Sequence, residues 1–159
     1  MNLYIRKKAY TFMDRYDVLD DTGRLVYMLD GKITVFGGKM TLRDHEGVEL
    51  YELRKNVDPF FGNYKVIDLS DGAEAAVIRQ QFHIHPRFRM TAGEQTYTVR
   101  GNLKACDYDI YNTGSSYALL RKRTLRWGNT YVLSLQDYNY APLFTSLVVG
   151  IDAAVFHHS

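Results

Sequence analysis

The chain has 159 residues and a formal net charge of +2, with 46% hydrophobic and 24% charged residues. This length and composition are typical of one globular domain over residues 1–159, and they exclude a wholly disordered chain. The only cysteine is Cys106, which excludes a scaffold of intramolecular disulfides and a zinc cluster built from cysteines.

Turn-forming residues divide the chain into short segments from its beginning. Residues 1–8 lack the apolar core and cleavage site of a signal peptide, so we expect a cytoplasmic location. Glycine supplies positive φ and aspartate binds its own backbone, which predicts turns at residues 20–23, 30–31, 37–38, 44–47 and 70–72. The segments between these turns are expected strands at residues 16–19, 24–29, 32–36, 40–43, 48–53, 64–69 and 73–82.

Apolar and polar residues alternate with a period of two in the second half of the chain as well. Phe88 and Met90 alternate with Arg87 and Arg89. Cys106, Tyr108 and Ile110 alternate in the same way with Asp107 and Asp109. The third set is Tyr131, Leu133 and Leu135, which alternate with Ser134 and Gln136. This pattern indicates an antiparallel sheet with one packed face. We expect roughly ten to twelve short strands, a number that closes or stacks. The loops at residues 56–63 and 112–116 are too short for domain linkers.

Residues 141–156 form the most informative segment, because they are apolar on nearly every side. A helix of this kind has to be buried. It is too short for a bilayer, which needs roughly 20 apolar residues, and it carries Asp152. Pro142 suits the first helical turn. We therefore predict a mainly β fold, a closed antiparallel barrel around a buried C-terminal helix, in which Asp152 has a partner or lies at a barrel mouth.

Clusters of basic residues are the main candidates for a binding site. Arg87 and Arg89 share one strand face, and Arg121, Lys122, Arg123 and Arg126 form the densest basic run. Several cations on one face attract a phosphorylated head group, a membrane surface or a nucleic acid. The simpler interpretation is a solvated outer face balanced by acids elsewhere, which the small net charge favours.

Other motifs give little sign of chemistry. His83 and His85 share a strand face without a visible third metal ligand, so ordinary strand histidines are the simpler interpretation, and no metal or cofactor is expected. Asp107 and Asp109 are read as solvent-facing, and Cys106 as a small core residue. No Gly-x-Ser-x-Gly or phosphate-binding glycine motif is present, so we expect no enzyme. Whether the terminal His157 and His158 are native is left open.

A set of short motifs extends over almost the whole chain. They are Leu3-Tyr4-Ile5, then Asp14, Tyr16, Val18, Asp20, Gly23, Tyr27 and Gly31, then Asp44 with Gly47, Pro86-Arg87-Phe88, Val99-Arg100-Gly101-Asn102, Asp107-Tyr108-Asp109-Ile110 and Ile151-Asp152-Ala153. Their order and spacing resemble the LURP-one-related family of the tubby C-terminal-like superfamily, to which phospholipid scramblases also belong.

The resemblance implies a barrel of about twelve strands around a buried C-terminal helix, and no catalytic residues to carry over. Tubby domains bind phosphoinositide head groups, and scramblases act at membranes through an acidic, calcium-loop-like segment before the final helix. Residues 134–139, at that place here, lack the spaced carboxylates of a calcium loop. The resemblance therefore does not imply calcium-driven scrambling.

The expected function is that of a non-catalytic binding or scaffold domain, which engages an anionic lipid head group such as a phosphoinositide, or a protein partner, through a basic face of the barrel. A peripheral membrane location is compatible with this. One alternative is a small-molecule carrier or enzyme with a pocket at one barrel end, and another is a nucleic-acid or transcription-linked binding module. The sequence leaves the ligand, the pathway and the oligomeric state open.

Overall fold

The computed structural model describes residues 1–9, 12–34, 36–56, 63–81, 87–102, 107–125 and 128–156. Most of them lie in strands. The strands are β1 (Asn2–Ala9), β2 (Asp14–Leu19), β3 (Leu25–Thr34), β4 (Gly37–Asp44), β5 (Glu49–Lys55), β6 (Asn63–Asp68), β7 (Glu74–Gln81), β8 (Arg87–Ala92), β9 (Gln95–Asn102), β10 (Asp107–Asn112), β11 (Ser115–Leu125) and β12 (Gly128–Leu135). The 3₁₀ helix η1 (Tyr138–Tyr140) and the helix α1 (Ala141–Phe156) follow.

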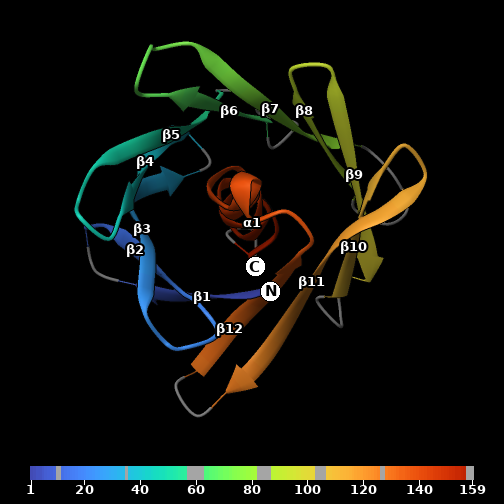
Figure 1. The fold of residues 1–159 in the computed structure, drawn as a ribbon. Helices are drawn as coiled ribbons and strands as arrows, with labels where there is room; N and C mark the ends of the chain where they lie inside the picture. Colours follow the sequence, from blue (N-terminus) through green and yellow to red (C-terminus); the bar gives the residue numbers. More distant parts are fainter. Residues whose placement is uncertain are drawn as a thin grey trace.

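The strands form one closed antiparallel barrel. Each strand pairs with the next, and β1 pairs with β12, where Leu3 lies opposite Leu133 (Figure 1). Closure leaves the sheet without a free edge. The alternation seen in the sequence places one set of side chains inside: Phe88 and Met90 of β8 are fully buried, as are Val99 of β9 and Leu120 of β11.

The helix α1 runs through the centre of the barrel (Figure 1). Phe144, Leu147 and Val148 are among its fully buried residues, and they belong to one continuous core with the inner strand residues. Gly150 faces the ring of Tyr64, where an added Cβ would lie in ordinary contact at 3.7 Å. These positions confirm the prediction of a barrel around a buried helix. In the part of the chain that the structure describes, no helix has the length and apolar character needed to cross a membrane.

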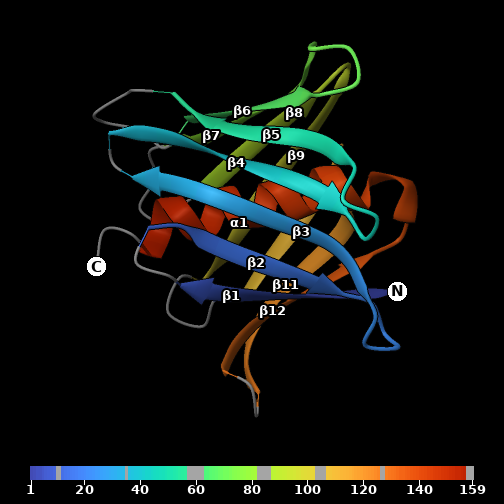
Figure 2. The same ribbon diagram turned by 90° about the vertical axis from the view of Figure 1, so that its left-hand side faces the viewer.

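The two ends of the barrel differ. We call the end with the connections β2–β3, β4–β5, β6–β7, β8–β9 and β10–β11 the turn end, and the opposite end the loop end. Aspartates order several connections at the turn end: the Asp44 carboxylate accepts hydrogen bonds from the backbone N–H groups of Glu46 and Val48, both at 2.9 Å. Figure 2 shows α1 along the barrel, running from the turn end to the loop end.

Two of the expected turns are wrong. Asp30 and Gly31 lie inside β3, which spans Leu25–Thr34 and so joins most of the two strands expected at residues 24–29 and 32–36. Gly31 has φ +145°, and an added Cβ would lie 2.2 Å from the carbonyl oxygen of Lys39 in β4. The glycine therefore permits a close approach of two strands. Residues 37–38 likewise open β4 and pair with β3.

Two of the expected loops are shorter than the sequence suggests. Asn63, placed in the loop 56–63, begins β6, and residues 57–62 lie outside the described part. The expected loop at residues 112–116 contains only Thr113 and Gly114 between β10 and β11.

Candidate functional site

Four arginines occupy the outer surface of three adjacent strands. Their inner neighbours Ile78, Phe88 and Val99 are fully buried, so alternation places the arginines on the outside. We call this set the arginine face: Arg79 of β7, Arg87 and Arg89 of β8, and Arg100 of β9. Arg79, Arg89 and Arg100 are exposed to solvent.

The strand register sets these arginines against one another. Arg79 lies opposite Arg89 across the pair β7–β8, and Arg87 lies opposite Arg100 across the pair β8–β9. Like charges at opposite positions destabilise a sheet. With respect to the described residues, Arg79, Arg89 and Arg100 make no ion pair; the guanidinium of Arg100 lies 5.8 Å from the ring centre of Tyr111. The positive charge of Arg79, Arg89 and Arg100 is thus not offset by carboxylates in the described part of the chain.

A surface hollow of about 570 Å³ lies at the β6–β8 side of the arginine face. Its walls include Asn63, Val77, Arg79, Gln81, Arg89 and Thr91. Guanidinium, amide and hydroxyl groups are all hydrogen-bond donors, and the planar guanidinium matches the oxygen pairs of phosphates and carboxylates. The hollow therefore offers donors of the kind that an oxyanion needs.

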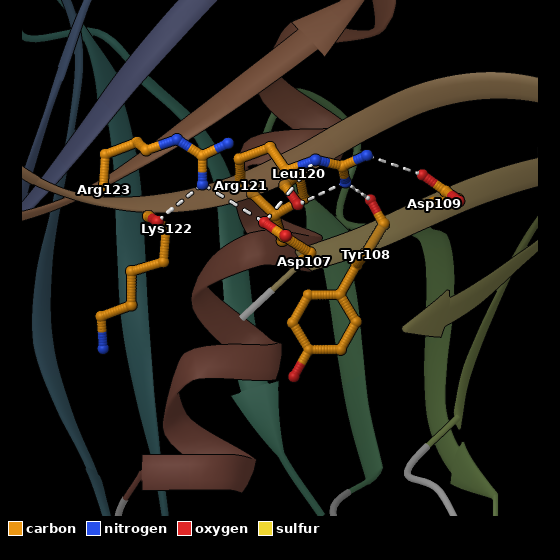
Figure 3. A network of polar contacts seen from close by, with 7 residues as sticks. All are labelled: Asp107, Tyr108, Asp109, Leu120, Arg121, Lys122 and Arg123. Atoms are coloured by element: carbon orange, nitrogen blue, oxygen red, sulfur yellow. Dashed lines mark hydrogen bonds and ion pairs between the residues drawn. The ribbon is translucent and has the colours of Figure 1, made fainter. Parts of the chain in front are cut away.

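The second basic cluster expected from the sequence has a different environment. Arg121 Nη2 lies 3.1 Å from Asp109 Oδ1, and Arg123 Nη1 lies 3.3 Å from Asp107 Oδ1 (Figure 3). Arg121 Nη1 also donates a hydrogen bond of 2.8 Å to the carbonyl oxygen of Tyr108. Carboxylates of β10 thus offset the charge of these two arginines, and the pair Asp107 and Asp109 serves as their partner.

Lys122 points away from its two basic neighbours (Figure 3). Its register on β11 is that of the buried Leu120, and its ammonium lies 5.5 Å from the ring centre of Tyr131. The structure therefore brings Arg87 and Arg89 together but separates them from Arg121 and Arg123 by the strands β9 and β10. Arg126 lies outside the described residues.

Arg79 and Arg100 were not among the residues expected from the sequence. Each is an isolated cation in its own strand, and its sequence neighbours give no hint of a site. The only available signal was the alternation around them, because Ile78 and Val99 mark the inner positions. Their position opposite Arg89 and Arg87 follows from strand register, which the sequence does not specify.

A second polar cluster lies inside the barrel, around Asp152 of α1. Its carboxylate accepts hydrogen bonds from the hydroxyl groups of Tyr16 at 2.5 Å and Tyr131 at 2.6 Å, and Lys7 Nζ lies 3.7 Å away. Burial, together with the nearby carboxylate, raises the pKa of Tyr16 well above its ordinary value of 10.0. Asp152 thereby links the helix to β1, β2 and β12, the strands at which the barrel closes, and the expectation that it needs a partner is confirmed.

Several residues considered in the sequence lie outside the described part. They are His83, His85, Cys106, His157 and His158. Among the residues that are described, no three His, Cys, Asp or Glu side chains gather as metal ligands would. The arginine face is therefore the candidate site that the geometry supports best.

Known proteins resemble the chain in sequence pattern and in fold. The family model described as LURP-one-related matches residues 1–152. A crystal structure of a protein from Arabidopsis thaliana superposes with a TM-score of 0.61 at 16% sequence identity, covering 95% of this chain and 90% of that chain. At such low identity this likeness shows the fold alone. No curated protein matches the chain.

Proposed function

The chain belongs to the LURP-one-related family, and from this premise we propose that it is a non-catalytic binding domain that recognises the phosphate groups of anionic phospholipids through its arginine face. The proposal depends on one observation above all, that Arg79 and Arg89 face each other across β7 and β8 and make no ion pair with the described residues. Like charges at opposite positions lower the stability of the sheet when nothing offsets them. A bound anion offsets them, and guanidinium groups form strong, bidentate hydrogen bonds with phosphate.

The interior of the barrel supports a surface ligand over an enclosed one. The helix α1 occupies the centre, and its residues Phe144, Leu147 and Val148 are fully buried against the strands. A carrier or enzyme of this fold would need an open cavity at that place. The outer face of β7–β9 already offers a hollow with donors, which favours a binding domain.

The distribution of charge supports a lipid head group over a nucleic acid. The net charge is only +2, and carboxylates of β10 flank the arginine face on the side of β11. Nucleic-acid binding depends on many phosphate contacts along an extended basic surface. A patch that spans three strands fits one or a few head groups.

The experiment that tests this proposal is sedimentation with lipid vesicles. The wild-type protein should bind phosphatidylcholine vesicles that contain phosphatidylserine or a phosphoinositide, and not pure phosphatidylcholine, with weaker binding as salt is raised. In the double variant Arg79→Gln/Arg89→Gln, two cations worth about 1 kcal/mol each at such a surface are lost, so binding should weaken by about 30-fold.

The matched control is Arg121→Gln/Arg123→Gln, which removes the same charge from arginines that already have carboxylate partners. Its binding should fall much less than that of the first variant. Equal losses in the two variants would mean that only net charge matters, and unchanged binding of Arg79→Gln/Arg89→Gln would refute the proposed site. A gel shift with DNA or RNA that exceeds vesicle binding would favour the nucleic-acid alternative.

A further inference from the structure

Two phenylalanine side chains at the loop end are almost fully exposed. Phe12, between β1 and β2, is 90% exposed, and Phe36, between β3 and β4, is 85% exposed. They belong to neighbouring hairpins, because β2 pairs with β3. Water is a poor environment for a whole aromatic ring, whereas the boundary between lipid head groups and acyl chains is a favourable one. Together they form an apolar tip at one end of the barrel.

Lysines surround this tip in an arrangement that presents their charge outward. Three lysines near this end each form an ion pair with an acid. The pairs are Lys32 with Asp14, Lys8 with Asp17, and Lys39 with Glu52. In each pair the acid is the buried partner; the Lys39 side chain is 68% exposed and that of Glu52 only 10%. In each pair the ammonium group is therefore the one that solvent reaches, while the carboxylate is largely shielded.

Charge is also divided along the barrel. The turn end carries a series of acids beside the single connection cation Arg24, and the acids in the described residues there include Asp20, Asp21, Asp44, Glu46, Asp68, Asp71, Glu94 and Asp137. The three strand residues nearest the loop end carry many cations and only the acids Asp14, Asp107 and Asp109 among the described residues. These cations are Lys7, Lys8, Arg15, Lys32, Lys39, Arg54, Lys55, Lys65, Arg79, Arg87, Arg89, Arg100 and Arg123. An anionic surface attracts the loop end and repels the turn end, so it orients the barrel before contact.

We propose that the loop end is the membrane-contacting end of the protein, with Phe12 and Phe36 inserted at the boundary between head groups and acyl chains. This inference rests on the proposed function and adds an orientation and an apolar anchor to it. Lys8, Lys32 and Lys39 then lie at the level of the lipid phosphates. The arginine face, whose residues lie within three positions of the loop end, reaches head groups from the side.

Vesicle binding of phenylalanine variants tests the anchor. The double variant Phe12→Ala/Phe36→Ala should bind vesicles that contain phosphatidylserine at least about tenfold more weakly than wild type, because two apolar contacts are lost. Its melting temperature should stay close to wild type, since both rings are exposed. The matched control is Val48→Ala, a 52% exposed apolar residue at the turn end, which should bind as wild type does.

A second measurement reports depth directly. In a Trp127→Phe background, tryptophan placed by Phe12→Trp or Phe36→Trp should shift its emission to shorter wavelength on vesicles and be quenched by brominated acyl chains, whereas tryptophan from Val48→Trp should do neither. The same result for all three positions would overturn the proposal.

The outcomes separate this inference from the function on which it rests. If Arg79→Gln/Arg89→Gln loses binding while Phe12→Ala/Phe36→Ala keeps it, the anchor is refuted and the arginine site stands. If the wild-type protein does not bind anionic vesicles, both fall. If the phenylalanine variant alters only self-association, measured by sedimentation velocity, the two rings belong to a protein interface and the membrane anchor is refuted.

Discussion

Replacement of Asp152 by alanine tests how the helix is fixed inside the barrel. The carboxylate accepts hydrogen bonds from the Tyr16 and Tyr131 hydroxyl groups and lies 3.7 Å from Lys7 Nζ. Without it, two buried hydroxyl groups lose their acceptor, and each loss costs about 1–3 kcal/mol. We therefore expect the free energy of unfolding to fall by about 4 kcal/mol, which lowers Tm by about 8–16 °C for a chain of this size. Asp152→Asn keeps one oxygen acceptor and should lose about half as much.

Urea unfolding followed by tyrosine and tryptophan fluorescence measures this change. The matched control is Thr145→Val on the same helix, because the buried Thr145 hydroxyl has no hydrogen-bond partner among the residues that the structure describes. Removing a hydroxyl of that kind should leave stability unchanged or raise it by about 1 kcal/mol. A loss of less than about 1 kcal/mol for Asp152→Ala would refute the idea that the carboxylate fixes the helix.

Four further predictions concern the barrel. Gly31→Ala should destabilise the protein by at least about 3 kcal/mol, because its Cβ would lie 2.2 Å from a carbonyl oxygen. The control Gly23→Ala has open space around the added Cβ and should cost only about 1 kcal/mol, both values being measured by urea unfolding. Val148→Asp should prevent folding because it buries a charge in the core, and a melting temperature equal to wild type would contradict this. Burial raises the pKa of Asp17, but hydrogen bonds from Lys8 and Arg15 outweigh this effect and hold the pKa below 3.8. The stability that this carboxylate contributes is therefore present above pH 3.8 and is lost as the pH falls through its folded pKa. In Asp17→Asn, the urea midpoint should fall less steeply in acid than it does in the wild-type protein. Burial raises the pKa of Tyr117 to about 12. The stability that its neutral hydroxyl contributes is therefore constant below pH 10 and is lost between pH 10 and pH 12. If Tyr117→Phe unfolded in alkali in the same way as the wild-type protein, this prediction would be contradicted.

The architecture could be predicted because its signals are local. Apolar residues on every side of residues 141–156 indicate a buried helix, and a period of two fixes which strand residues face it. The same period places Arg87 and Arg89 together on the outside of β8. It also separates Lys122 from Arg121 and Arg123, so that a dense basic run in the sequence is not a single patch in space.

Features that depend on register or on distant contacts could not be predicted. Shifts such as the one between Val66 and Ile67 change which residues face each other, and no local pattern specifies them. The hydrogen-bond partners of Asp152 come from strands up to 136 residues earlier in the chain. At Gly31 the pattern Asp-Gly is the same for a turn and for a close approach of strands, and only the neighbouring strand decides between them.

The pairing of β1 with β12 has a consequence for synthesis on the ribosome. The first strand to emerge has its closing partner only after more than a hundred further residues, and α1, which fills the centre, is made later still. Until then the nascent sheet has open edges and an uncovered apolar face, both of which favour aggregation. Folding of this barrel is therefore completed after translation has passed residue 156, and chaperones that shield nascent chains should increase its yield.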